Sequence, residues 1–372
     1  MDTPRFDAVV IGAGIAGATA AAAIAADRRV ALVEAEEAPG YHTTGRSAAL
    51  WTENYGPADV RHLTRLSRAF FEHPPAGFTE TALMQPRGTV FVATAAQMPV
   101  FREILAGATG VQEIPIAELR RMVPAVRPGY AAAAMHERDA FDMDVAALHQ
   151  GFLRQFRARG GTLALRSRSA RIERRNGTWD VHTTSGAIFA APVLVNAAGA
   201  WGDEVAAQAE VAPLGLVPKR RTGMIIDPAP WEVAAWPMLG DVGETWYVRP
   251  EARTRLMVSP ADTTPMHPHD VQPDELDVAL AIDRMQQALD IAVTRIERSW
   301  SGLRTFTADG SLALGWDATA EGFFWSVGQG GYGIMTSPAA GKLIADVTAG
   351  RDPGEAVSLL PVVDPRRFRA AA

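Results

Sequence analysis

The sequence predicts a mixed α/β (α+β) fold, in which a domain built on a parallel sheet is interleaved with a second domain of mostly antiparallel strands plus helices. Three observations support this class. A glycine-rich strand–helix–strand pattern opens the chain, short strand-like runs bounded by turn residues fill its middle, and glycine-rich texture returns after residue 306. One domain must therefore be assembled from separated segments. We expect it at residues 1–84, 145–215 and 307–372, and the second domain at 85–144 and 216–306.

The opening segment has the features of a Rossmann-like dinucleotide-binding unit. An apolar run is followed by Gly12, Gly14 and Gly17 at G-x-G-x-x-G spacing, then by an alanine-rich helix and a second apolar run that ends at Glu34. Gly12 permits the tight turn, Gly14 lets a pyrophosphate approach the backbone, and Gly17 allows the helix to pack closely on the strand. The helix N-terminus offers free N–H groups to the pyrophosphate, and Glu34 can accept hydrogen bonds from the ribose hydroxyls.

The elements after residue 36 follow from local patterns. Apolar residues at helical spacing predict helices, and alternating or apolar runs between turn residues predict strands. We expect helices at 60–71, 98–108, 116–123, 145–159, 273–294 and 334–348. We expect strands near 88–93, 111–115, 131–144, 193–196, 224–227, 245–250 and 255–260, and a β-meander between 162 and 195 with turns at Asn176-Gly177 and Ser185-Gly186.

Composition excludes several classes of protein. The chain has 372 residues, of which 48% are hydrophobic, and a net charge of −6, which argues against a nucleic-acid partner. It has no cysteine, so disulfides, thiolate metal sites, iron–sulfur clusters and a cysteine-tethered flavin are excluded, and we expect no metal. No run approaches the roughly 18 apolar residues of a membrane span. The first strand starts too early for a secretory signal, so we expect a cytoplasmic protein.

Features outside the fingerprint indicate which dinucleotide binds. Glu34 argues against the 2′-phosphate of NADP, but the fingerprint alone does not separate NAD from FAD. Three segments favour FAD: the hydroxyls and arginine of residues 43–47, the tight turn at 196–199, and the glycine-rich run 328–333. The last precedes a helix whose N-terminus could stabilise negative charge on a reduced flavin ring.

With these motifs in place, the chain resembles the D-amino-acid-oxidase superfamily of flavoproteins, and within it the bacterial D-arginine dehydrogenase group. The segments that carry the resemblance are GYHTTGRSAA, PKRRTG, HDVQPDELD, WSGLRTFTADG and EGFFWSVGQGGYGIMTS, which together span nearly the whole chain. The resemblance implies an FAD domain covered by an interleaved, mostly antiparallel substrate domain.

The motifs and the resemblance together give the expected site of a non-covalently bound FAD. Its residues come from the fingerprint, the second strand end, the loop at 43–49, the turn at 198–201 and the glycine-rich segment near the C-terminal end. They are Gly12, Ala13, Gly14, Ile15, Ala16, Gly17, Glu34, Ala35, Thr43, Thr44, Gly45, Arg46, Ser47, Ala48, Ala49, Ala198, Gly199, Trp201, Arg304, Gly330, Gly331, Tyr332, Gly333 and Ile334. We expect His42 to make a hydrogen bond within its loop rather than to act as a base or a flavin tether.

Flavin-dependent amine oxidation moves a hydride from the substrate Cα to flavin N5, so the substrate carboxylate must be held in a fixed orientation. A guanidinium is well suited to this task. Arg304 and Arg221 match the family's carboxylate-binding arginines by resemblance, although Arg220 could replace Arg221 because neighbouring strand residues face opposite ways. Tyr247 is the expected phenol donor.

The resemblance also implies a lid and a backbone contact. The lid would bring Tyr55 over the substrate, with Gly45 and Gly56 as hinges, and the backbone carbonyl of Gly331 would lie near the substrate amine.

The substrate pocket departs from the D-arginine pattern. The glutamate that pairs with a substrate guanidinium in that group corresponds here to Thr89, the lid histidine to Leu50, and a glutamine near the flavin to Met335. Trp246 adds to the apolar character, while Glu53 on the lid could supply a replacement carboxylate. Loss of the distal charge removes selection for a basic side chain.

The predicted function is therefore oxidative deamination of free D-amino acids with neutral or hydrophobic side chains by an FAD-dependent dehydrogenase. The imino acid product would hydrolyse to a 2-oxo acid and ammonia, and a quinone or another acceptor would take the electrons. The alternatives are a glycine, sarcosine or imino-acid oxidase of the same fold, and a D-arginine or D-lysine dehydrogenase with a rearranged pocket. An NAD-linked dehydrogenase, a flavin module acting on tRNA and an idle flavin sensor are weaker rivals.

Overall fold

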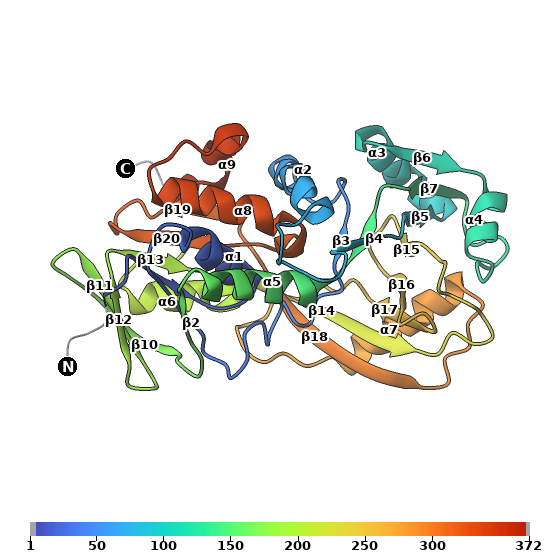
Figure 1. Cartoon of the computed structure of the whole chain (residues 1–372). Helices are drawn as coiled ribbons and strands as arrows, with labels where there is room; N and C mark the ends of the chain where they lie inside the picture. The colour runs from blue at the N-terminus through green and yellow to red at the C-terminus, as the bar shows by residue number, and fades with distance from the viewer. Residues whose placement is uncertain (1–4, 370–372) are drawn as a thin grey trace.

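The computed structural model describes residues 5–369. Two large sheets lie toward opposite ends of an elongated molecule, and helices cover them (Figure 1). The strands of the first sheet come from segments near both ends and the middle of the chain. Those of the second lie between residues 89 and 306. The predicted boundaries between the two interleaved domains stay a prediction.

The first sheet is six-stranded, with the order β19-β20-β13-β1-β2-β9. All neighbours are parallel except β19 and β20, which are antiparallel. The central strands are buried on both faces, which is why they read as unbroken apolar runs in the sequence. Their bounds are β1 (Ala8–Ile11), β2 (Val30–Val33), β9 (Thr162–Ala164), β13 (Val193–Asn196), β19 (Ala313–Trp316) and β20 (Phe323–Val327).

The two faces of this sheet carry different layers because side chains alternate along β1. Ala8 and Val10 pack with four helices, whereas Val9 and Ile11 pack with a small antiparallel sheet and another helix. The four helices are α1 (Ile15–Ile24), α2 (Ala58–Glu72), α5 (Val145–Ala158) and α8 (Gly333–Thr348). The opposite layer consists of β10 (Ser169–Arg175), β11 (Thr178–Thr183), β12 (Ile188–Ala191) and α6 (Gly202–Gln208).

The small sheet is the predicted meander, but its two ends differ from the prediction. The first extended run divides, and β9 leaves it to pair in parallel with β2. The last run also divides, because β13 inserts between β1 and β20. Sequence alternation detects the strands but not this change of partner.

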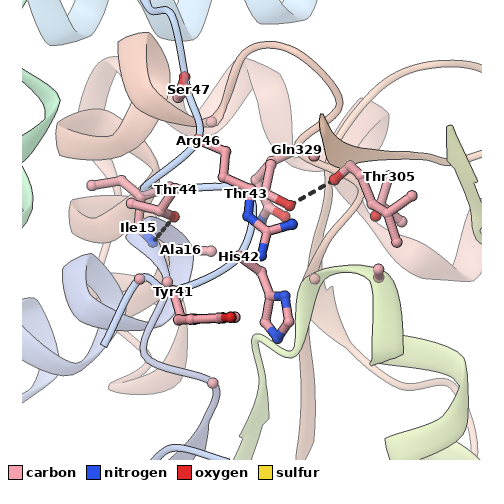
Figure 2. A pocket seen from close by; sticks show the side chains of 18 of the residues that line it. Ile15, Ala16, Tyr41, His42, Thr43, Thr44, Arg46, Ser47, Thr305 and Gln329 are labelled. Atoms are coloured by element: carbon pink, nitrogen blue, oxygen red, sulfur yellow. Dashed lines mark hydrogen bonds between the residues drawn. The ribbon is translucent and has the colours of Figure 1, made fainter. Parts of the chain in front are cut away.

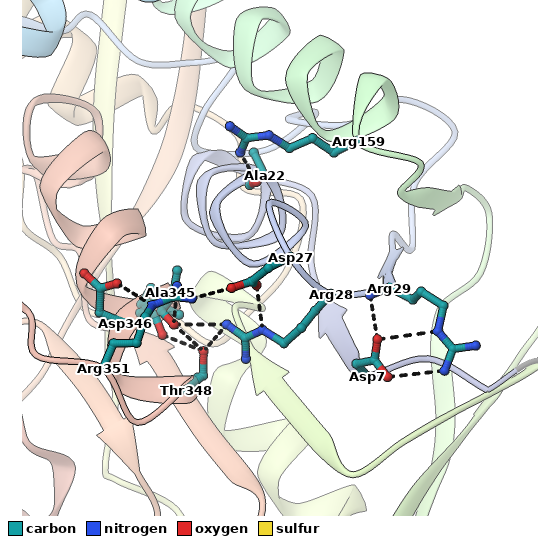
Figure 3. Close-up of polar contacts among 11 residues, drawn as sticks. Asp7, Ala22, Asp27, Arg28, Arg29, Arg159, Ala345, Asp346, Thr348 and Arg351 are labelled. Carbon is teal, nitrogen blue, oxygen red and sulfur yellow. Dashed lines mark hydrogen bonds and ion pairs between the residues drawn. The ribbon is translucent and has the colours of Figure 1, made fainter.

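Polar contacts at the C-terminal ends of α1 and α8 fix these helices on each other (Figure 3). Arg28, just beyond α1, donates to the Ala345 carbonyl and to the Thr348 hydroxyl, each at 3.0 Å. Arg351 pairs with Asp27 and, at 3.0 Å, with Asp346. The basic groups thus satisfy carbonyls that end α8, where the helix carries partial negative charge.

The second sheet is eight-stranded, with the order β18-β14-β17-β16-β15-β5-β7-β6. Every neighbouring pair is antiparallel except β15 and β5. One of its faces packs in an apolar core with α4 (Ile116–Met122) and α7 (Glu275–Ala288). Its strands are β5 (Thr89–Ala93), β6 (Val111–Ile114), β7 (Ala133–Glu137), β14 (Val217–Ile226), β15 (Met238–Asp241), β16 (Tyr247–Glu251), β17 (Arg255–Ser259) and β18 (Ile296–Phe306).

Three elements of the eight-stranded sheet and its helices differ from the prediction. Strand β15 was not expected, and β14 starts seven residues before the expected run. Helix α7 is shorter than 273–294, because the Asp274 carboxylate caps its start and the chain turns extended at Leu289, which packs in the core. The remaining elements are α3 (Met98–Gly107), α9 (Leu360–Val363) and a three-stranded sheet of β3 (Leu50–Trp51), β8 (Phe141–Met143) and β4 (Met84–Pro86).

Candidate active site

A long cavity runs from the carboxyl ends of β1 and β2 to the inner face of the eight-stranded sheet. Its volume is about 1530 Å³, counting the part that is open to solvent. The residues that line it come from both large sheets, so an elongated ligand such as a dinucleotide would reach from one sheet toward the other. Its position also matches the place where parallel sheets bind ligands, beyond the carboxyl ends of the strands.

The glycine fingerprint forms one end of the cavity. Gly12 has φ of +99°, and a Cβ there would lie 2.5 Å from the Ala197 carbonyl oxygen. A Cβ on Gly17 would lie 1.7 Å from the Gly12 carbonyl oxygen. Both positions therefore require glycine, one for conformation and close contact and the other for packing of helix on turn. The start of α1 consequently faces the cavity with its backbone exposed.

Thr44 caps the same helix start. Its hydroxyl accepts a hydrogen bond from the Ile15 N–H at 2.9 Å, as Figure 2 shows. The other N–H groups of this first turn have no partner inside the helix, and the helix dipole places partial positive charge there. This end of the cavity is suited to a phosphate group.

Glu34 lies on the cavity wall at the end of β2. Its carboxylate accepts the Ala13 N–H at 2.7 Å and the Glu36 N–H at 2.9 Å. These contacts fix the side chain beside the glycine turn and leave acceptor capacity on both oxygens. His42 lies near this end, with Nε2 3.1 Å from a Glu36 carboxylate oxygen and its ring 4.6 Å from the Trp201 ring. The contact between His42 and Glu36 corresponds to the local hydrogen bond that we expected for His42.

The loop at 40–48 joins the two large sheets. The Thr43 hydroxyl donates to the Leu303 carbonyl at 2.7 Å, and Arg46 donates to the Ser301 carbonyl at 2.9 Å and pairs with Asp270 at 2.5 Å. Trp300 donates to the Arg46 carbonyl at 3.0 Å. We expected Arg46 among the FAD-binding residues. Arg46 does line the cavity, but its guanidinium is already bonded to the Ser301 carbonyl and the Asp270 carboxylate.

Two arginines occupy the other end of the cavity. Arg221 on β14 and Arg304 on β18 both line it. The register pairs Arg221 with Gly302 and Lys219 with Arg304, so both arginines face the same side of the sheet. Arg220 faces the opposite side, where it pairs with carboxylates, among them Asp277 at 2.6 Å. The alternation of side chains therefore decides the choice between Arg220 and Arg221 in favour of Arg221.

Two tyrosines accompany these arginines. Tyr247 lines the cavity from β16, and the Tyr55 hydroxyl accepts a hydrogen bond from Arg304 Nη1 at 3.1 Å. Gly331 closes this group, because a Cβ there would lie 2.7 Å from the Tyr55 oxygen and 3.0 Å from Arg304 Nη1. Of the five predicted catalytic residues, the structure places four on the cavity wall and Tyr55 directly against them.

The charges of these groups reinforce one another. Burial alone would raise the pKa of the Tyr247 phenol, but Arg304 and Arg221 outweigh it and lower that pKa. Burial alone would lower the pKa of Arg304, but the oxygens of Tyr55, Tyr247 and Tyr332 outweigh it and raise that pKa. Burial raises the pKa of Tyr332 to about 12. The cavity end is thus permanently cationic, and Tyr332 stays neutral.

None of the five predicted substrate-pocket residues lines the cavity. Trp246 faces away from it, because it alternates with Tyr247, and it is 1% exposed in the core beside α7. Met335 is a buried residue of α8, Thr89 is 2% exposed, Leu50 lies in β3, and Glu53 pairs with Arg65 at 3.1 Å. The structure therefore does not bring Leu50, Trp246 and Met335 together on the cavity wall, since spacing alone does not tell on which face a side chain lies.

Residues that the sequence analysis missed form much of the wall beside the arginines. Trp300, Gly302, Met257 and Gln329 line the cavity. Trp300, Gly302 and Arg304 are each two residues apart on β18, so their side chains face the same side of the sheet. Trp300 and Gly302 could therefore have been found if 296–306 had been recognised as a strand. Five predicted cofactor residues are not on the wall: Ala13, Gly17, Gly45, Ala49 and Tyr332. Ala13 and Gly17 lie directly behind it.

A match to a known family identifies the cofactor. A family model described as FAD dependent oxidoreductase (DAO) matches residues 7–347. The chain belongs to this family. DAO-family proteins are flavoproteins, so the predicted cofactor, FAD, is confirmed, and the NAD-linked alternative is wrong.

Individual relatives point to other substrates than the resemblance did. Over 392 residues the chain is 25% identical to the glycine oxidase of Pseudomonas aeruginosa, and the match covers 98% of each protein. Over 230 residues it is 26% identical to the L-2-hydroxyglutarate dehydrogenase of Indibacter alkaliphilus, covering 58% of this chain and 56% of that protein. The chain thus spans about half the length of that curated relative. Neither protein is a D-arginine dehydrogenase.

A solved structure confirms the mixed α/β fold class. The glycine oxidase from Geobacillus kaustophilus superimposes with a TM-score of 0.85 at 22% identity, covering 98% of this chain and 99% of that one. None of the helices within residues 5–369 has the length and apolar character needed to cross a bilayer. Within the same residues, no group of three or more His, Asp or Glu side chains is placed to hold a metal ion.

Proposed function

We propose that this flavoprotein oxidises the Cα–N bond of a small amino acid, and that its substrate class is glycine, N-methylglycine (sarcosine) or a cyclic imino acid. The observation that carries the proposal is the cationic end of the cavity. Arg221 and Arg304 face it together, and among residues 5–369 neither guanidinium has a carboxylate partner. Buried charges are normally paired, so this end calls for an anionic ligand.

The ligand that fits is a carboxylate. Two guanidinium groups can hold it by charge-assisted hydrogen bonds, and the hydroxyls of Tyr247 and Tyr55 add neutral donors. These contacts fix the orientation of the substrate, which is the main requirement for transfer from Cα. Gly331 lies beside the same group, and its carbonyl would accept a hydrogen bond from the substrate amine.

The crowding of this end favours a small substrate. The Tyr55 oxygen and Arg304 already fill the space that a single Cβ on Gly331 would need. A bulky group on the substrate would have to displace Tyr55, whereas glycine carries no side chain. The full-length similarity to a glycine oxidase supports the same class.

The protein's own groups position and neutralise the substrate. Gly12, Gly14, the start of α1 and Glu34 would hold the dinucleotide, and Arg221, Arg304 and Tyr247 would hold the carboxylate at the other end of the cavity. When bound, FAD would accept the hydride from the substrate Cα, and this hydride carries both electrons. The resulting imino acid adds water and releases ammonia, which gives glyoxylate from glycine.

A second candidate is the oxidation of D-amino acids with neutral side chains. The segments that resemble D-arginine dehydrogenases support it, and Met257 and Trp300 give the cavity wall an apolar surface that a side chain could contact. This candidate requires Tyr55 to move away from Gly331.

Anaerobic mixing of the holoenzyme with single compounds tests the proposal. The panel contains glycine, sarcosine, D- and L-proline, D-alanine, D-leucine, D-arginine and L-2-hydroxyglutarate, and bleaching of the flavin absorbance is followed. We expect the fastest reduction with glycine, sarcosine or proline. Faster reduction by D-leucine would favour the second candidate, and reduction by L-2-hydroxyglutarate alone would contradict both. Reoxidation by oxygen and by a soluble quinone, measured on the reduced enzyme, tests the predicted acceptor.

A further inference from the structure

We propose that Glu137 and Thr52 are positioning residues for Tyr55, and that they set the geometry of the carboxylate-binding end without touching the substrate. The inference rests on the proposed function, because it concerns the same site. It starts from Glu137, a buried carboxylate that does not line the cavity.

The segment that carries Tyr55 is a short link between two fixed elements. We call residues 52–57 the strap. Before it, Trp51 is fully buried, its ring lies 5.9 Å from that of Phe141, and the Arg68 guanidinium lies 4.9 Å from it. After it, α2 begins at Ala58. The segment without regular structure around Tyr55 is therefore much shorter than the predicted lid between Gly45 and Gly56.

Glu137 ties the first residue of the strap to the eight-stranded sheet. It ends β7, is 6% exposed, and its two carboxylate oxygens lie 2.9 and 2.8 Å from the Thr52 hydroxyl, whose single proton is shared between them. The same hydroxyl accepts the Asn54 N–H at 3.2 Å. Burial raises the pKa of Glu137, and the hydrogen bonds from the strap act against that rise.

Asn54 makes a second tie to the substrate half. Its side-chain amide donates to the Thr109 carbonyl at 2.9 Å, and the Thr109 N–H donates to its side-chain oxygen at 2.8 Å. Tyr55 is the next residue, and its hydroxyl contacts Arg304 at 3.1 Å. Three residues span at most about 10 Å, so a displacement of Thr52 is passed to Tyr55 with little slack.

A buried glutamate is unfavourable unless hydrogen bonds compensate it. Here that compensation comes from the strap, so the carboxylate holds the strap in one place. Without the Thr52–Glu137 contact, Tyr55 could move away from Arg304 and Gly331. The expected consequence is weaker substrate binding, with little change in the flavin site.

A double-mutant cycle in the holoenzyme tests this. Thr52→Val removes the hydrogen bond and Glu137→Gln weakens it by removing the charge of the acceptor, each with little change of shape. Thr52→Ser restores the hydroxyl, and Tyr55→Phe removes the group that is positioned. The apparent Kd and the limiting rate of anaerobic flavin reduction are measured with glycine, or with the best compound of the panel. Thr183→Val is the matched control, because it also removes a buried hydroxyl that bonds a carbonyl, on β11.

We expect Thr52→Val to raise Kd by about 5- to 30-fold, the range of a lost hydrogen bond of ~1–2 kcal/mol, and Glu137→Gln to raise it by less. Thr52→Ser should restore it, and Thr52→Val should add nothing to Tyr55→Phe, because coupled residues are not additive. An equal fold-change in the wild-type and Tyr55→Phe backgrounds would overturn the proposal.

Hydrogen exchange of the holoenzyme gives a readout that needs no substrate. Amides of residues 52–57 and Thr109 should exchange faster in Thr52→Val and Glu137→Gln, but not in Thr183→Val. Unchanged exchange would also overturn the proposal. If no compound of the panel reduces the flavin, the proposed function fails, and the exchange measurement alone decides the role of Glu137 and Thr52.

Discussion

The two ends of the cavity are built from different kinds of groups. The dinucleotide end is formed mostly by backbone atoms and glycines. Gly12 turns the chain, the start of α1 presents N–H groups, and Thr44 caps one of them. At the substrate end, side chains from strands far apart in the sequence meet on one sheet face, with Arg221, Tyr247 and Arg304 as the central members. A backbone site tolerates variation in side chains, whereas a side-chain site depends on register.

This difference explains where the two ends are vulnerable. A change of backbone shape at the first end should remove the cofactor and with it all activity. A change of one side chain at the second end should leave the yellow holoenzyme intact and reduce its reaction with substrate. Four experiments test this division, beginning with the largest expected effect.

Gly12→Ala should abolish flavin binding. The new Cβ would lie 2.5 Å from the Ala197 carbonyl oxygen at a φ of +99° that alanine rarely adopts. We expect colourless purified protein, measured as the ratio of flavin to protein absorbance. Gly177→Ala is the control, since it has a φ of +78° with open space around it and lies in a distant turn. Retention of full flavin by Gly12→Ala would remove the backbone argument.

Arg304→Ala should keep its flavin and lose about 10²- to 10³-fold in kcat/KM. Charge-assisted hydrogen bonds contribute roughly 1.5–3 kcal/mol each, and a carboxylate makes up to two with one guanidinium. Steady-state kinetics on the best substrate measures the effect. Arg295→Ala, an exposed arginine just before β18, is the matched control and should be near wild type. Unchanged kinetics for Arg304→Ala would contradict the assigned carboxylate site.

Tyr247→Phe should change the alkaline side of the pH profile. Arg304 and Arg221 lower the pKa of Tyr247 below its usual 10, against the effect of burial. A neutral phenol donates to the carboxylate, whereas a phenolate repels it, so binding is present at low pH and is lost as pH rises through that lowered pKa. We expect kcat/KM to fall before pH 10 in the wild type, and this limb to disappear in Tyr247→Phe, with a roughly tenfold lower plateau. The same limb in both proteins would assign it to another group.

Thr44→Val should have the smallest effect. It removes the hydroxyl that accepts the Ile15 N–H at 2.9 Å, and loss of such a cap costs about 1 kcal/mol. We expect FAD to bind roughly fivefold more weakly in a titration of the apoprotein, with kcat unchanged at saturating FAD. Thr44→Ser should restore the affinity. A large loss of kcat would show that the loop at 40–48 acts on the substrate end as well.

The sequence by itself determined the dinucleotide end. Strand, turn, helix and acidic strand end follow one another within residues 8–34, so their contacts are local and a spacing pattern is enough to find them. The same is true of the helices, whose apolar periodicity is local, and of the family, whose motifs lie in contiguous segments.

Only the tertiary structure decided the substrate end. Arg220 and Arg221 are adjacent in sequence, and the pairing of β14 with β18 determines which of them faces the cavity. The same alternation turns Trp246 into the core, and helix packing buries Met335, although both are apolar residues near site motifs. Thr52 and Glu137 are 85 residues apart and meet only because β7 and the strap are adjacent in space. Facing and pairing depend on long-range register, and no local pattern encodes register.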